Sequence, residues 1–423
     1  MIDLRTLMAR MLEEEHDPEV HPLAVEAVLY ERYADARRLL PPPPRPKPAE
    51  RLAAALTGSM PSADDLRAVN RERWLLRSAS SQAARLALVE RSTSRYRSPL
   101  LVARLLGEAR LAVHGSPAEA FELAELAATV AAQGAAGAGS LALALAYQAN
   151  AHRADGRLTK AAPLFDRAWR LVRLQGGRSW VHGEIASLQG SWLKDSRRFD
   201  DAHQCLRYAV EQFELDDDPV AVARALMIRA DCYRLGAEPQ RAVHTVGQAL
   251  DLLHPLADAR LVLFALHNLC RYLVALDEPE RADALFRLLA PNYEALDDRQ
   301  TTVRRSWLEG VIAHRLGDAE RAETALRRAL DEYVAMPVPY YAALVSLDLC
   351  LLLLDQGRAR EVTALAATLP PLFAAEGIRP EATAAVVLLH RAAARRRLDA
   401  ALLDRLRDFF ERAQVDRNAR LNP

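Results

Sequence analysis

A small residue returns at a nearly constant interval through most of this 423-residue chain. In seven successive frames, a turn is followed five residues later by the same kind of side chain, which we call the anchor: Ala120, Ala161, Ala202, Ala242, Ala282, Ala322 and Val362. Successive anchors lie 41, 41, 40, 40, 40 and 40 residues apart. Self-similarity at a fixed period of about 20 to 50 residues is typical of repeat architectures. The chain is therefore expected to be an array of similar units.

Each unit has the pattern of two amphipathic helices joined by a tight turn that carries Gly, Asp or Pro. Twelve residues before the anchor, the first helix has a small residue: Ala149, Gly190, Ala230, Cys270, Gly310 or Cys350. Seven residues after the anchor, the second helix has Ala127, Ala168, Ala209, Ala249 or Ala329, with Leu289 and Leu369 as exceptions. Antiparallel helices approach to about 8–10 Å only where one of them presents small side chains. We therefore expect Gly310 and Ala322 to make room inside one helix pair, and Leu326 and Ala329 to contact the next.

The composition agrees with an all-helical chain. Apolar residues make up 51% and aromatic residues only 6%, and Ala and Leu, which favour helices, supply most of the apolar fraction. The four cysteines have no CxxC spacing: Cys205, Cys232, Cys270 and Cys350. They are expected to be small buried hydrophobic residues and not zinc ligands or disulfides.

Charge and hydropathy exclude several classes of partner. Lys plus Arg and Asp plus Glu are both 56, so no overall charge attracts nucleic acid or anionic lipid. No run of about 18 apolar residues predicts a membrane span. The opening stretch turns acidic at "EEEHDPEV", where a secretory signal is apolar. A cytoplasmic protein without membrane contact is expected.

The order of small residue, turn, alanine, bulky residue and alanine resembles the tetratricopeptide repeat (TPR) family over roughly residues 100–370. The bulky residue is Phe165, Leu206, Val246, Phe286 or Leu326. The resemblance implies an all-α fold, a right-handed α-α superhelix (α-solenoid) of tandem helix hairpins whose first helices line a concave groove. The family's usual period is about 34 residues, so the helices here are expected to be longer. Such long repeats are similar to those in sensor arms of bacterial regulators.

The ends depart from the repeat register. We expect five segments: an N-terminal helical segment (1–40), a Pro-rich linker (41–50), N-terminal helices (51–98), about seven repeats (99–370), and a degenerate repeat with C-terminal capping helices (371–423). The prolines between Leu39 and Glu50 predict a stiff, non-helical polyproline strut, or alternatively a docking peptide for an SH3-like partner. Ser62 is expected to cap a helix.

Motifs of catalysis and cofactor binding are missing from the sequence. Searches for GxxxxGK[ST], GxGxxG, GxSxG, HExxH and paired CxxC find no convincing match. "GAAGAGS" (Gly134–Ser140) is expected to be a flexible loop between repeats and not a phosphate cradle. The ligand-rich segment Glu13–His21 leaves metal binding as an alternative. No enzyme activity, cofactor or metal is predicted.

Cations recur on the first helices. Four residues after the small position, the chain has Arg153, Lys194, Arg234, Val274, His314 and Leu354. Further candidates for a partner groove lie one residue after the small position or one turn before it: Asn150, Arg271, Arg224 and Arg304. This set resembles the family's carboxylate clamp, in which Lys, Arg and Asn of adjacent repeats hold a peptide's carboxylates. Alternatively, the cations lie on a solvated face and are neutralised by Glu184, Asp195 and Asp231.

Towards the C-terminus the equivalent positions are apolar: Leu344, Leu347, Leu351 and Leu354. They are expected either to be buried by the last helices or to form a hydrophobic contact surface.

The leading hypothesis is a non-catalytic scaffold or adaptor that binds a segment of a protein or peptide in the groove, and the cations favour an acidic partner. One alternative is the sensory or regulatory arm of a bacterial signalling or transcription system. Residues 1–98 show no helix-turn-helix pattern, so specific nucleic-acid binding is not expected. A second alternative is an enzyme whose site is built from scattered residues.

Overall fold

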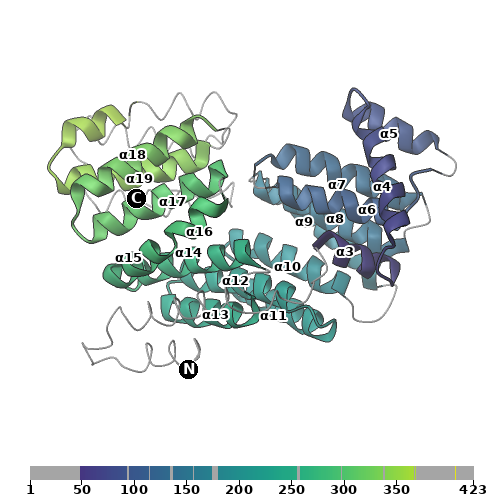
Figure 1. Ribbon diagram of the computed structural model, residues 1–423, viewed down its shortest axis with the longest axis horizontal. Helices are drawn as coiled ribbons and strands as arrows, with labels where there is room; N and C mark the ends of the chain where they lie inside the picture. The colour runs from purple at the N-terminus through teal and green to yellow at the C-terminus, as the bar shows by residue number, and fades with distance from the viewer. Residues whose placement is uncertain are drawn as a thin grey trace. The chain divides into compact units, whose positions relative to one another are not determined.

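The computed structural model describes residues 48–365, apart from 93–94, 114, 134–136, 156, 174–179, 255–257, 297 and 337–338, together with the single positions 367 and 405. These described residues form helices and no strands (Figure 1). The helices are α3 (Pro48–Thr57), α4 (Ala63–Arg77), α5 (Gln82–Arg91), α6 (Pro99–Ala112), α7 (Pro117–Ala132), α8 (Gly137–Ala154), α9 (Leu158–Arg173), α10 (Trp180–Asp195), α11 (Phe199–Leu215), α12 (Pro219–Leu235), α13 (Pro239–Leu252), α14 (Ala259–Ala275), α15 (Pro279–Leu288), α16 (Ala290–Leu296), α17 (Arg299–Arg315), α18 (Ala319–Val334) and α19 (Pro339–Asp355), followed by a helical stretch at 359–365. The predicted all-α fold is confirmed.

Several predictions fall on residues outside this description. They concern the segment 1–40 with its ligand-rich Glu13–His21, the linker as far as residue 47, and nearly all of residues 371–423. One boundary is corrected, because α3 begins at Pro48, inside the stretch predicted to be non-helical. Proline is tolerated in the first turn of a helix, where its missing N–H has no helical partner and its φ is already suitable.

The helices follow one another as pairs, and we call the first helix of each pair A and the second B. From α6 to α11 and again from α17 to α19, each helix packs against the next one in the chain. The described chain divides into two compact units at the boundary between Cys232 and Tyr233. We call them the N-unit (described residues up to 232) and the C-unit (described residues from 233).

The small residues that define the period lie in the packed interior. All seven anchors are buried, with at most 2% of their surface exposed. The small positions of the A helices are buried as well, including Gly190 and Gly310. In this way the sequence pattern predicted which positions allow close helix contact.

The turns between A and B helices repeat with the same period. Five of them place one residue in the left-handed region at intervals of 40 residues, with φ of 55°, 61°, 65°, 79° and 72°: Arg197, Ala237, Asp277, Gly317 and Gly357. In each turn the N–H of the following residue donates to the carbonyl five positions earlier, over 2.8–2.9 Å. This hydrogen bond is the one that ends a helix with a left-handed residue.

Local chemistry explains the start of α4, which was predicted, and the start of α8, which was not. Ser62 caps α4 as expected: its Oγ accepts from the Asp65 N–H at 3.2 Å, and Asp65 Oδ2 accepts from the Ser62 N–H at 3.0 Å. The loop predicted at Gly134–Ser140 is wrong for its second half, because α8 begins at Gly137. The glycine there has a φ of 70° at the very start of the helix, where it does not incur the cost of an interior position.

The B helix after Asp277 is divided into α15 and α16 instead of being continuous. Pro291 has no N–H for the carbonyl of Arg287, and its ring crowds that carbonyl, so the helix is interrupted nearby.

None of the helices that the structure describes is both long enough and apolar enough to cross a membrane.

Candidate peptide-binding face on the A helices

In the N-unit, two predicted groove cations share one carboxylate, that of Asp195. Arg153 Nη1 lies 2.6 Å from Asp195 Oδ2, and Lys194 Nζ lies 2.8 Å from Asp195 Oδ1. Lys194 Nζ also lies 3.2 Å from Asp231 Oδ2. Asn150 Oδ1 accepts a hydrogen bond from Arg153 Nε at 2.8 Å. Alternating charges therefore connect three successive A helices, α8, α10 and α12.

Lys194 and Asp195 are both charged at neutral pH. Burial alone would lower the pKa of Lys194, but Asp195 and Asp231 outweigh it, so that pKa lies above its ordinary value. Burial would raise the pKa of Asp195, but Lys194 and Arg153 hold that pKa below its ordinary value. The acids are the ones that the alternative interpretation named, and here they neutralise Arg153 and Lys194.

A less complete pairing lies elsewhere in the N-unit. Arg224 Nη2 is 3.7 Å from Glu184 Oε2, and Glu184 Oε1 accepts a 2.7 Å hydrogen bond from the Tyr147 hydroxyl. Glu184 is 3% exposed. Among the described residues, the buried Arg224 Nε has no hydrogen-bond acceptor. Arg224 is therefore the N-unit cation whose hydrogen bonding is least complete among those predicted here.

In the C-unit, Arg271 and Arg304 come from consecutive A helices and act on the same two side chains. Burial, and then the charges of Arg271 and Arg304, lower the pKa of His267 to about 3, so its imidazole is neutral. Its Nδ1 lies 2.7 Å from the Tyr293 hydroxyl. Burial raises the pKa of Tyr333 to about 12, although Arg304 and Arg271 oppose the change. The charges of two predicted cations thus act on the same two neutral side chains, His267 and Tyr333.

Arg304 makes no ion pair with any carboxylate in the part of the chain that the structure describes. Its charge acts on Tyr333, and its guanidinium lies 5.8 Å from the centre of the Phe264 ring, a cation–π distance. The side chain is half-buried. A cation partly withdrawn from water without an adjacent acid favours a carboxylate from outside the chain.

The remaining candidates do not join this group. His314 Nε2 lies 2.8 Å from Asp355 Oδ2 on α19, and Arg234 is half-buried on α12. Each unit therefore holds its own set of predicted residues.

The apolar A-helix positions near the C-terminus are mostly enclosed. Leu344 is 8% exposed and Leu347 is fully buried. Leu351 and Leu354 are partly buried against the same hydrophobic cluster. Of the two expected outcomes, burial describes these leucines better than an open contact surface.

The sequence analysis did not select three neighbours of this place: Phe264, His267 and Trp307. Phe264 and Arg304 each lie six residues before the small position of their helix, and His267 and Trp307 lie three residues before it. Residues at one position of consecutive repeats lie on the same face. Extending the repeat alignment to these two positions would therefore have found all three.

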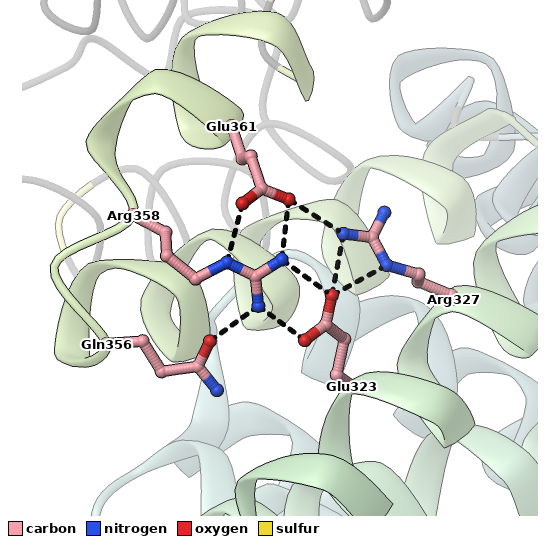
Figure 2. Close-up of polar contacts among 5 residues, drawn as sticks. All are labelled: Glu323, Arg327, Gln356, Arg358 and Glu361. Atoms are coloured by element: carbon pink, nitrogen blue, oxygen red, sulfur yellow. Dashed lines mark hydrogen bonds and ion pairs between the residues drawn. The ribbon is translucent and has the colours of Figure 1, made fainter.

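A second polar cluster, on the B helices of the C-unit, is shown in Figure 2. Arg358 Nη1 lies 2.5 Å from Glu323 Oε2, and Arg358 Nε lies 2.6 Å from Glu361 Oε1. Arg327 Nη2 bonds both acids, at 2.7 Å and 3.3 Å, and Gln356 Oε1 accepts from Arg358 at 2.7 Å. Because each charge has an opposite partner, this cluster holds α18 to the next B helix and offers no unmatched charge to a ligand.

Chemistry of other kinds has little support within the described ranges. No group of three His, Cys, Asp or Glu side chains there is placed to hold a metal ion. The cysteines are free thiols. Burial raises the pKa of Cys205 to about 11 and the pKa values of Cys232 and Cys350 to about 12. Thiols with such pKa values are protonated and are poor nucleophiles.

No protein-family model matches this sequence, and no curated protein sequence matches it significantly. Among solved structures, a Rap protein in complex with the competence and sporulation factor is similar over 75% of this chain and 88% of its own, with 14% identity and a TM-score of 0.57. A signal transduction ATPase with numerous domains (STAND) from Pyrococcus horikoshii, which has a TPR sensor, is similar over 96% of this chain and 70% of its own, with 11% identity and a TM-score of 0.51.

Identities this low establish a shared fold only. The helix pairs have a buried residue at every anchor, and the chain is similar to a TPR sensor protein. These two findings lead to the same conclusion. The fold of this chain is an all-α solenoid of the tetratricopeptide-repeat type, with a long period of 40 to 41 residues.

Proposed function

We propose that this chain is a non-catalytic interaction module that binds an acidic segment of a protein or peptide on the A helices of the C-unit. Arg271 and Arg304 receive a carboxylate of that segment. The observation that carries the proposal is the half-buried Arg304, which has no carboxylate partner among the described residues and whose charge acts on the neutral His267. Arg–carboxylate hydrogen bonds are charge-assisted and can be bidentate, so this pair of guanidiniums suits such a ligand.

Aromatic side chains beside the two arginines extend the binding surface. Phe264 lies under Arg304, and the Trp307 ring lies 6.1 Å from the ring of Tyr333. Such rings offer apolar contact area for the side chains that flank an acidic residue. The ligand is therefore a short stretch in which Asp or Glu, or a terminal carboxylate, is next to an apolar residue.

The proposal assigns some of the other predicted groove residues to binding and others to stability. Arg224 is the candidate for the same function in the N-unit, since its Nε lacks an acceptor among the described residues. Arg234 and His314 lie on A helices of the same unit, and the proposal assigns them no direct contact with the carboxylate. Asn150, Arg153 and Lys194 are assigned to stability, because Asp195 and its neighbours engage them.

Two solved structures of the same fold support a binding role. The Rap protein was solved with the competence and sporulation factor, and the STAND protein has its repeats as a sensor. The second structure favours the alternative that this chain is the sensory arm of a signalling system. That alternative requires the same binding step.

The test begins with random peptides displayed on phage and selected on the full chain. Enrichment of Asp and Glu next to apolar residues is the expected outcome. One selected peptide is then measured by fluorescence anisotropy against the wild type and Arg304→Glu, and we expect Arg304→Glu to bind at least about tenfold more weakly.

Arg360→Glu is the matched control. Arg360 is exposed, lies in the helical stretch at 359–365 of the same unit, and has no ion pair within the described residues. It should bind the peptide like the wild type. If Arg304→Glu retains full affinity, or if both charge reversals weaken binding equally, the proposed site is wrong.

A further inference from the structure

α3 is a ten-residue helix that packs against the A helices of two repeats. Its main contacts are with α6, the A helix of the first repeat, and it also touches α10, two repeats further on (Figure 1). Isolated helices shorter than about 12 to 15 residues are marginal in water. The helical state of α3 therefore depends on the surface that receives it.

The described contacts of α3 include a small apolar face, one ion pair and a 3.4 Å hydrogen bond from Arg51 Nη1 to the Asp217 carbonyl. Leu52 and Ala53 are 3% and 4% exposed. Arg51 Nη1 lies 2.9 Å from Asp218 Oδ1, and Asp218 is itself 3% exposed. Asp218 Oδ2 accepts a 3.0 Å hydrogen bond from Trp180 Nε1 at the start of α10. The carboxylate that receives Arg51 is thus held in place by the repeats and does not depend on α3 for its orientation.

α8 is the A helix between α6 and α10. The face of α8 that the repeat pattern assigns to the groove is largely closed to solvent. α8 packs against both of these helices. Leu143, Ala146 and Asn150 occupy three of the groove positions of α8 and are 0%, 0% and 6% exposed, and Arg153 at a fourth is half-buried in its ion pair with Asp195. A partner therefore has no access to this part of the N-unit while its present contacts persist.

From these contacts we infer that the A helices of the N-unit form a receptor site for a short helix, and that α3 is its built-in occupant. This inference rests on the proposed function, in which A helices bind partner segments. The ligand chemistry follows from α3 itself: a helical protein segment with small and aliphatic side chains on one face and a cation that reaches Asp218. Such a partner binds only when α3 leaves.

The local structure permits α3 to leave without unfolding a repeat. Gly58 follows α3 with a φ of 78°, and α4 begins only at Ala63. Within α3, Leu52 and Ala53 are the side chains described as buried. Segments with few buried apolar contacts open at a lower free energy than the global unfolding of the chain.

The test uses the full chain and a fluorescently labelled synthetic peptide with the sequence of Pro48–Thr57. In the wild type, the tethered α3 competes at a high effective concentration, so the added peptide should bind weakly. In Leu52→Asp, which places a charge on the buried face of α3, we expect the added peptide to bind at least about tenfold more tightly than to the wild type. A peptide that carries Arg51→Glu should not bind either protein. Equal binding of the unmodified peptide to both proteins, or no binding to Leu52→Asp while that protein is folded, would overturn the inference.

A milder variant covers the outcome in which Leu52→Asp does not fold. Arg51→Ala removes the ion pair to Asp218 and the 3.4 Å hydrogen bond to the Asp217 carbonyl but leaves the apolar face of α3 intact. Hydrogen exchange followed by mass spectrometry then compares α3 with α8. Faster exchange in α3 with unchanged protection in α8 is the expected result. Simultaneous loss of protection in both helices would mean that α3 is an integral part of the repeats and not an occupant. Arg304→Glu lies outside this site, so failure here is distinguishable from failure of the acidic-ligand proposal.

Discussion

Gly310 faces Leu326 so closely that a methyl group at Gly310 would come within 2.6 Å of Leu326 Cγ. The pair connects α17 with α18. Gly190 and Leu206 repeat the relationship between α10 and α11, where the distance would be 2.7 Å. Carbon atoms in packed interiors do not approach this closely. In these two pairs the leucine of the B helix therefore requires a glycine on its A helix.

Gly310→Ala is expected to lower the free energy of unfolding by about 1–3 kcal/mol, because overpacking outweighs the better helix propensity of alanine. Urea denaturation measures the change. Gly115→Ala is the control, since a methyl group there would have no neighbour within 4 Å, and it should leave stability nearly unchanged. An unchanged Gly310→Ala protein would contradict the packing explanation.

The fold could be predicted because it depends on side-chain size at fixed spacing. The anchors and Gly310 were recognisable for that reason. Leu326 was expected to contact the next helix pair, but it also fills the space beside Gly310 inside its own pair. Whether each cation has an acidic partner could not be predicted in the same way. Arg153 and Arg304 are both arginines on A helices, yet Arg153 finds Asp195 in the next repeat, 42 residues away, whereas Arg304 lies near Tyr333 and over Phe264 and has no acid partner among the described residues. That difference depends on rotamers across a helix interface, which the spacing does not specify.

Ala237→Gly is expected to stabilise the chain by about 1 kcal/mol. Ala237 has a φ of 61°, and a left-handed conformation costs an L-residue about 1–2 kcal/mol that glycine does not incur. Gly317→Ala, at the equivalent turn with a φ of 79°, should destabilise by a similar amount. Thermal unfolding of both variants measures the effect, and shifts of the same sign would contradict it.

Asp195→Asn should reduce both the stability at neutral pH and its dependence on pH. The pKa of Asp195 is lower in the folded chain than in the unfolded one. Its ion pairs therefore stabilise the fold above the ordinary pKa of an aspartate, and this contribution is lost as the pH falls through the folded value. Because Asp195 is half-buried, its removal should cost about 1–3 kcal/mol, less than the loss of one member of a fully buried pair.

The measurement is urea denaturation of the wild type and Asp195→Asn at several pH values from neutral to strongly acidic. The difference between the two proteins should be largest at neutral pH and should shrink as the pH falls. A constant difference across this range would show that Asp195 contributes through packing and not through its charge.

The four cysteines should be protected from a thiol reagent in the folded protein. Burial raises the pKa of Cys232 to about 12, and Cys270 and Cys350 are also buried. The half-buried Cys205, whose pKa is about 11, should react first. Absorbance assays with an aromatic disulfide at mildly alkaline pH, with Cys205→Ser as a comparison, follow the rates. Rapid reaction of all four in the absence of urea would contradict the packed interior described above.

The role of Arg304 is tested most directly by a charge reversal on both sides of the complex. The acidic residue of a selected peptide is replaced by lysine, and its affinity is measured by anisotropy against the wild type and Arg304→Glu. We expect each single reversal to weaken binding by at least about tenfold and the combination to recover most of the loss. If the combination binds no better than the weaker single reversal, the carboxylate does not dock at Arg304.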